Sequence, residues 1–159
     1  MVILDLSKYL FFIFFFILSC DNKMNKCENI NLNSYILIRG YKSSDEIVKT
    51  AYLISYTDNF QTIKDSTIAE NIINFHKKGY FKSEVSINFD SKISTANSYK
   101  LVLNNKNSFN ISNYVLASDS VMVGMNLQKT CFIDSMLVNN KFVKKIGVTF
   151  NFHKNLGYQ

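Results

Sequence analysis

The sequence predicts a mainly β fold, an antiparallel β-sandwich of immunoglobulin-like or prealbumin-like architecture with one short α-helix, preceded by an N-terminal signal or anchor helix. Three observations predict this class. About seven or eight short runs alternate apolar and polar residues, they follow one another at roughly ten-residue spacing, and turn-forming residues separate them. No Pro/Gly-rich linker divides the 159 residues, so we expect one folded domain.

The N-terminal run from Tyr9 to Leu18 is entirely apolar, with Lys8 before it and Ser19 and Cys20 after it. A basic start, a short apolar core and a small residue are the plan of a secretory signal. A membrane-spanning helix needs about 20 apolar residues, so this run is too short to cross comfortably. The alternatives are an uncleaved apolar anchor and an ordinary buried segment.

The end of this run, Ile17-Leu18-Ser19-Cys20, resembles the lipobox of bacterial lipoprotein signals. The resemblance implies cleavage before Cys20 and acylation of that cysteine, palmitate included, with two or more chains giving a stable anchor. Leu18 is bulkier than the usual residue, and Asp5 is an unusual acid in such a leader. We therefore expect a signal peptide at 1–19, a flexible tether at 20–33 and the β-sandwich domain at 34–159.

The net charge of +6 is unchanged if residues 1–19 are removed, because Asp5 and Lys8 leave together. Arg39 is the only arginine, and the lysines are scattered among acids. Bidentate recognition of phosphate or guanine favours arginine. We expect a solvated basic surface and no nucleic-acid partner.

The chain has three cysteines, and assigning Cys20 to lipid leaves Cys27 and Cys131 as a pair. A disulfide between them suits an oxidising compartment, and a loop of about a hundred residues would contribute up to ~4.7 kcal/mol in the chain-entropy model. The alternative is two unrelated cysteines.

The first strand is predicted at Tyr35–Arg39, where a short β-branched run ends at Gly40. Residues 45–56 allow two interpretations. Ser44 followed by two acids is typical of a helix start. A strand is favoured by the alternation of Val48, Thr50, Tyr52, Ile54 and Tyr56.

The one α-helix is predicted over Thr67–Gly79. Thr67 and Glu70 have the spacing of a capping box. Ile68, Ile72 and Phe75 fall on one helical face, and basic residues precede a glycine suited to the C-terminal cap. His76 is then a residue of the last helical turn rather than a ligand.

The rest of the chain predicts strands. Tyr99, Leu101 and Leu103 form a candidate hairpin with Phe109 and Ile111 across the turn at 104–108. Other strands are expected from the alternation of Val85, Ile87 and Phe89, of Val121, Val123, Met125 and Leu127, from a start at Cys131-Phe132-Ile133, and from Ile146, Val148, Phe150 and Phe152.

No pattern in the sequence indicates catalysis. There is no glycine elbow around a serine, no phosphate-binding glycine loop, and no HExxH or CxxC motif. His76 and His153 are the only histidines, and neither has ligand spacing to a cysteine. We expect no catalytic residue, no metal and no cofactor.

Asp-Ser pairs precede Thr67, Val121 and Met136. Each tripeptide resembles the Asp-Ser/Thr-apolar acceptor for O-glycosylation in bacteria of the Bacteroides group, with Ser66, Ser120 and Ser135 as the implied sites. Turn chemistry explains these pairs equally well, since both side chains bond to nearby backbone.

Several segments together resemble small lipoproteins of the Bacteroidota that have no assigned function. They are the lipobox-like end, Ile36–Tyr41, Ile63–Ser66, Ser98–Leu103 with Phe109–Ser112, and Cys131 with Val138–Asn140. The resemblance implies a β-rich fold held in the cell envelope, at the periplasmic or surface face of the outer membrane. It carries over no functional residue except Cys20.

We therefore expect a lipid-anchored, non-enzymatic binding or accessory module for a protein or glycan partner. One alternative is a periplasmic immunity or inhibitor lipoprotein that neutralises a toxin, which would need a strongly charged groove. An envelope hydrolase is a weaker alternative, which would need His76 or His153 beside a Ser, Cys or carboxylate in a pocket.

Overall fold

The computed structural model describes residues 27–41, 46–57, 59–75, 83–147 and 149–157. These residues are mainly β, as predicted. The strands are β1 (Asn31–Leu32), β2 (Tyr35–Tyr41), β3 (Ala51–Thr57), β4 (Thr62–Phe75), β5 (Ser83–Phe89), β6 (Ile93–Ser94), β7 (Ser98–Leu103), β8 (Asn107–Val123), β9 (Asn126–Val138), β10 (Lys141–Gly147) and β11 (Phe150–His153). A 3₁₀ helix, η1 (Lys154–Leu156), follows the last strand.

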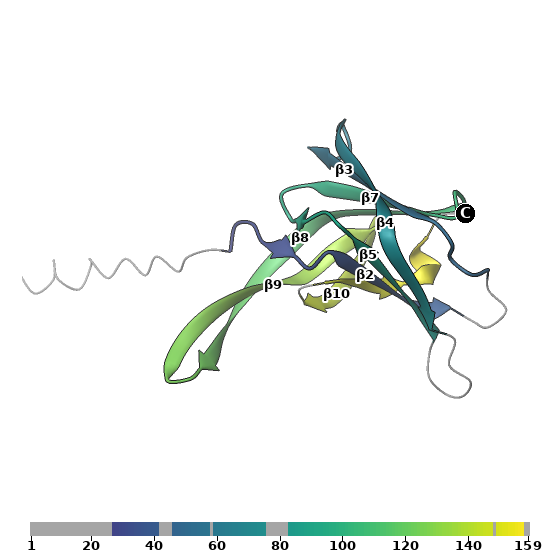
Figure 1. Ribbon diagram of the computed structural model, residues 1–159. Helices are drawn as coiled ribbons and strands as arrows, with labels where there is room; N and C mark the ends of the chain where they lie inside the picture. The colour runs from purple at the N-terminus through teal and green to yellow at the C-terminus, as the bar shows by residue number, and fades with distance from the viewer. Residues whose placement is uncertain (1–26, 42–45, 58, 76–82, 148, 158–159) are drawn as a thin grey trace, which may run out of the picture.

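Nine strands form one sheet in the order β10-β9-β8-β7-β3-β4-β5-β2-β11, and β1 pairs with β6 in a small second sheet. The edge strands β10 and β11 contact each other, so the large sheet curls until it nearly closes on itself (Figure 1). Its last pair is parallel, with β11 beside β2. An antiparallel sandwich, immunoglobulin-like or prealbumin-like, is therefore not confirmed, because one curled mixed sheet takes the place of two facing sheets.

The core lies inside the curled sheet. Alternate residues of the strands point inward, and one buried cluster unites strands from both ends of the chain. Its largest fully buried members are Phe89, Phe109, Phe150, Ile36, Ile38, Ile87, Ile93, Leu101, Leu103, Ile111, Ile133 and Met136.

Three predicted elements match the structure closely. The alternation from Val85 to Phe89 is β5, and the hairpin built on Tyr99–Leu103 is β7 joined to β8. The first strand is β2, which continues through Gly40 to Tyr41. Gly40 has φ +87°, and a Cβ there would lie 2.0 Å from Nε2 of His153, so the close approach of that ring requires glycine.

The predicted helix at Thr67–Gly79 is wrong. Residues up to Phe75 belong to β4, and residues 76–79 lie outside the described part of the chain. β4 pairs with β3 through its first half, Thr62–Ile68, and with β5 through its second half, Ala69–Phe75. Each half of β4 therefore has a ladder on one side, and its isoleucines suit a strand, so tertiary pairing overrides the local capping signal. Among the described residues, the only helix is η1.

The ambiguous segment 45–56 contains a strand, as favoured, but a shorter one. β3 starts at Ala51, while residues 46–50 have no regular structure and residue 45 is not described. The terminal strand also differs from the prediction: Phe150 and Phe152 lie in β11, whereas residue 146 belongs to β10 and residue 148 is not described.

The structure describes the chain from Cys27 onward. Asn31 and Leu32 pair with β6, and Leu32 is buried in the core. Residues 1–26, which hold the predicted signal peptide, Cys20 and half of the predicted tether, lie outside the described residues.

Candidate functional site

Two surfaces at opposite ends of β8 are the candidates for function. At one end, β8 and β9 leave the body as a two-stranded ribbon, drawn in green at the lower left of Figure 1. We call residues 117–132 the arm. Its two strands pair in register from Ala117 beside Phe132 to Val123 beside Asn126.

The arm ends in a two-residue turn at Gly124 and Met125. Gly124 has φ +63° and Met125 is not among the residues with positive φ. Positive φ at the first central position alone is the mark of a type II′ hairpin turn, which places glycine there. The predicted single strand over Val121–Leu127 is therefore wrong, because the chain reverses inside that alternation.

The tip of the arm, defined as Val121, Met122, Val123, Met125 and Leu127, is apolar and exposed. The exposed fractions of these side chains are 45%, 64%, 52%, 97% and 68% in that order. Apolar side chains are scattered singly on most surfaces, whereas a contiguous exposed group marks an interaction site.

A disulfide lies at the base of the arm. Cys27 and Cys131 are bonded, with their Cα atoms 6.0 Å apart, as the pairing of cysteines predicted. Cys131 stands opposite Ser118 in the β8–β9 ladder. Cys27, where the described part of the chain begins, is therefore fixed covalently to the arm.

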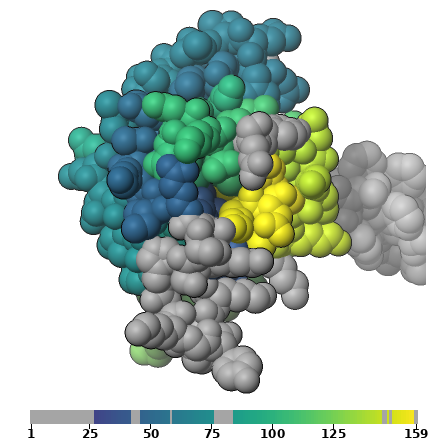
Figure 2. Space-filling model, turned by 90° about the vertical axis from the view of Figure 1, so that its right-hand side faces the viewer, coloured from purple at the N-terminus to yellow at the C-terminus, as the bar shows by residue number. Residues whose placement is uncertain are grey.

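At the other end of β8 the body has a cavity of about 910 Å³. Figure 2 looks onto this end, where the β7–β8 turn in green, the segment before β3 in blue and η1 in yellow meet. Val48, Leu103 and Phe109 line the cavity and are buried. Amide and charged side chains also line it: Glu46, Asn104, Asn105, Lys106, Asn107, Lys154 and Asn155.

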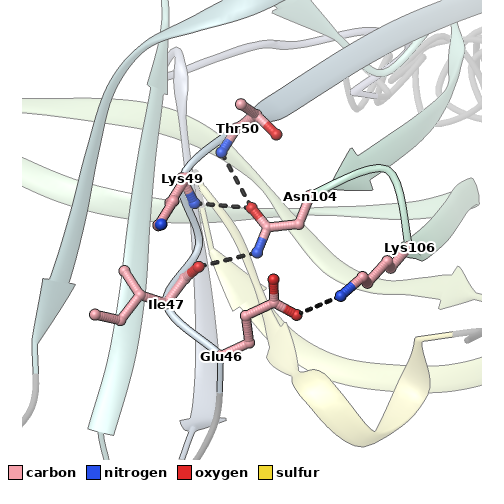
Figure 3. A network of polar contacts seen from close by, with 6 residues as sticks. All are labelled: Glu46, Ile47, Lys49, Thr50, Asn104 and Lys106. Atoms are coloured by element: carbon pink, nitrogen blue, oxygen red, sulfur yellow. Dashed lines mark hydrogen bonds and ion pairs between the residues drawn. The ribbon is translucent and has the colours of Figure 1, made fainter.

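Asn104 holds one wall of the cavity in place (Figure 3). Its Oδ1 accepts hydrogen bonds from the backbone N–H groups of Lys49 (2.8 Å) and Thr50 (3.2 Å), and its Nδ2 donates to the carbonyl oxygen of Ile47 (2.9 Å). This one amide satisfies three backbone groups of a segment with no ladder of its own. Lys106 adds an exposed ion pair to Glu46, 3.0 Å long.

The three Asp-Ser sites differ in accessibility. Ser66 and Ser120 are exposed, whereas Ser135 is 1% exposed, so its hydroxyl is inaccessible in the folded chain. Asp65 and Asp119 each accept a hydrogen bond from the N–H of the following serine. Local bonding of this kind is the alternative explanation of the motif.

Within the described residues, no hydrogen bond joins the His153 ring to a Ser, Cys or carboxylate side chain. Its Nδ1 accepts from the N–H of Asn155, and its ring packs against Gly40. His76 lies outside the described residues. Within those residues, no group of three or more His, Cys, Asp or Glu side chains is placed to hold a metal ion.

Neither candidate surface was predicted from the sequence. A glycine between two apolar runs was the available signal for the arm, and the Asn-rich turn 104–107 was the signal for the cavity.

Comparison with known proteins gives no relative: no family model, no curated protein and no solved structure matches the chain. Over the ranges that the structure describes, no helix has the length and apolar character needed to cross a membrane.

Proposed function

We propose that this chain is a lipid-anchored protein of the cell envelope that acts as a non-enzymatic binding module for a glycan. The proposal has two parts: a cellular location (the address), which is the cell envelope, and a ligand class, which is a glycan. The lipobox-like end at Cys20 supports the address, and the cavity supports the ligand.

The observation that carries the ligand class is the chemistry of the cavity. Its size lies in the range of about 300–1,000 Å³ typical of small-molecule sites. Asn105, Asn107 and Asn155 offer amide groups at its edge, each with a donor and an acceptor. Sugar hydroxyls are also both donors and acceptors, so amides can match neighbouring hydroxyls in pairs.

The charge of the cavity favours a neutral ligand over an inhibitor role. Lys106 is paired with Glu46, and the Lys154 ammonium lies 5.4 Å from the ring centroid of Tyr41. An immunity protein that recognises a charged toxin would need one dominant sign in this groove. Among the described residues that line it, two lysines and one glutamate carry no large excess of one sign. A flat protein partner is also less suited to a concave polar site.

The ligand is tested by screening the purified protein against bacterial and host glycans, followed by calorimetry on each hit. We expect Asn107→Ala to weaken binding about tenfold or more, because one or two hydrogen bonds to the ligand are lost. Asn126→Ala, an exposed asparagine on the arm, is the matched control and should bind normally. Absence of any glycan hit, or equal loss in both variants, would contradict the proposal.

The address is tested by the intact mass of the membrane-extracted protein beside Cys20→Ala. We expect a chain that begins at Cys20 and carries acyl mass, with both features lost in the variant. An unprocessed chain starting at Met1 would contradict the lipoprotein assignment.

A further inference from the structure

We infer that the tip of the arm inserts into the interfacial layer of the membrane that holds the lipid anchor. This inference rests on the proposed lipid anchor at Cys20. It assigns the arm a ligand class, a phospholipid surface, and an orientation for the whole domain.

The apolar side chains of the tip lie on both faces of the ribbon and at its turn, and this distribution supports insertion into lipid. Met122 and Leu127 are cross-strand partners and so share one face of the ribbon. Val121 and Val123 project from the opposite face, since neighbouring residues alternate, and Met125 stands at the turn. A ribbon that docks on a protein surface needs one apolar face. Apolar side chains on both faces and at the turn suit a medium that surrounds the tip.

The disulfide also supports insertion, because it limits the distance between the tip of the arm and the proposed lipid on Cys20. Cys20 precedes Cys27 in sequence by a stretch that reaches at most about 25 Å when fully extended. From Cys131 to Met125 the arm extends about 20 Å along β9. Both lengths start at the same covalent link. A lipid carried on Cys20 therefore keeps a membrane within reach of the tip.

Charge limits how deep the tip can go. Residues 121–127 carry no charge, and the nearest charged side chains are Asp119 and Lys129, on opposite strands. The uncharged part is about 10 Å long, which matches the 5–10 Å depth of interfacial insertion. The backbone at the ribbon's outer edges needs water or headgroups as partners, so the hydrocarbon core is out of reach.

Orientation follows from the path of β8. Val123 is at the tip and Asn107 lines the cavity, at opposite ends of this one strand. With the tip in the membrane, the cavity faces away from it and is open to soluble or surface glycans.

The test uses the absence of tryptophan from the chain. Leu127→Trp places a single fluorophore at the tip, and Ile68→Trp places one at a site of similar exposure on β4. Full-length variants are reconstituted into phosphatidylethanolamine/phosphatidylglycerol vesicles made with and without brominated acyl chains. We expect a blue shift and loss of most tryptophan emission in brominated vesicles for Leu127→Trp, and neither change for Ile68→Trp.

Other outcomes overturn the inference in separable ways. Equal emission of Leu127→Trp in both vesicle types, with acyl mass present on the chain, overturns tip insertion while the anchor stands. Emission that changes only when envelope proteins are added assigns the tip to a protein partner. A chain without acyl mass overturns the anchor, and quenching of the same variant still reports independently whether the tip enters lipid.

Discussion

The two ends of β8 differ sharply although one continuous strand connects them. Phe109, near its start, is 1% exposed and packs 5.0 Å from the ring of Phe152, whereas Met122, near its end, is 64% exposed. Both ends carry large apolar residues in the sequence. Apolar residues in a strand therefore do not indicate its surroundings: in the body they are buried in the core, and at the tip of the arm they are exposed.

Truncation of one side chain at each end of β8 tests this difference directly. We expect Phe109→Ala to lower the free energy of unfolding by about 3–5 kcal/mol, since it leaves a cavity in the core. Met122→Ala should change the free energy of unfolding by less than about 0.5 kcal/mol, since this exposed side chain buries little apolar surface. Chemical denaturation measures both. Similar losses would mean that the arm packs as part of the body.

The disulfide links the two regions, and its removal should have the next largest effect. We expect Cys27→Ser combined with Cys131→Ser to cost about 2–5 kcal/mol. The bond closes a sequence separation of 104 residues, so the unfolded chain gains much freedom without it. The melting temperature of the wild type with reductant should fall toward that of the double variant. If the double variant melts like the oxidised wild type, the bond does not restrain the unfolded chain.

At the cavity end, Asn104 offers a test of local order. We expect Asn104→Ala to cost about 1–3 kcal/mol, because three backbone groups lose their partner. The backbone at Asn104 also has φ +49°, which adds strain for alanine. Asn104→Asp keeps the acceptor and should lose less. Hydrogen exchange at Lys49 and Thr50 reads the effect directly, and unchanged protection in both variants would contradict it.

Where the arm joins the body, Tyr114 predicts a response to alkaline pH. Burial, followed by the neighbouring Tyr99, raises the pKa of Tyr114 well above its usual 10.0. The unfolded chain therefore loses this proton near pH 10 while the folded chain keeps it, so stability falls as pH rises above 10, by up to about 1.4 kcal/mol per pH unit. Denaturation at pH 9 and 11 should show this slope in the wild type and a smaller one in Tyr114→Phe. An equal slope in both would show that other groups cause it.

Sequence patterns predicted the strands of the body because their buried residues alternate cleanly, as in Val85–Phe89. The pairing of Cys27 with Cys131 followed from cysteine arithmetic. The helix prediction at Thr67–Gly79 failed because a capping box is a local signal, whereas β4 is fixed by pairing with β3 along its first half and with β5 along its second half. The arm was missed because Met125 in the turn continues the alternation of Val121 and Val123, so only Gly124 marked the reversal.

The parallel pairing of β11 with β2 has a consequence for how the domain assembles. Phe150 and Phe152 lie beside Ile36 and Ile38, across almost the whole folded chain. Contacts of such high sequence separation form slowly. Until β11 is synthesised, β2 keeps an unpaired edge that other strands can join. The nearly closed sheet thus forms only after β11 has been synthesised. A chain that stops before Phe150 retains an unpaired edge on β2, where another strand can pair.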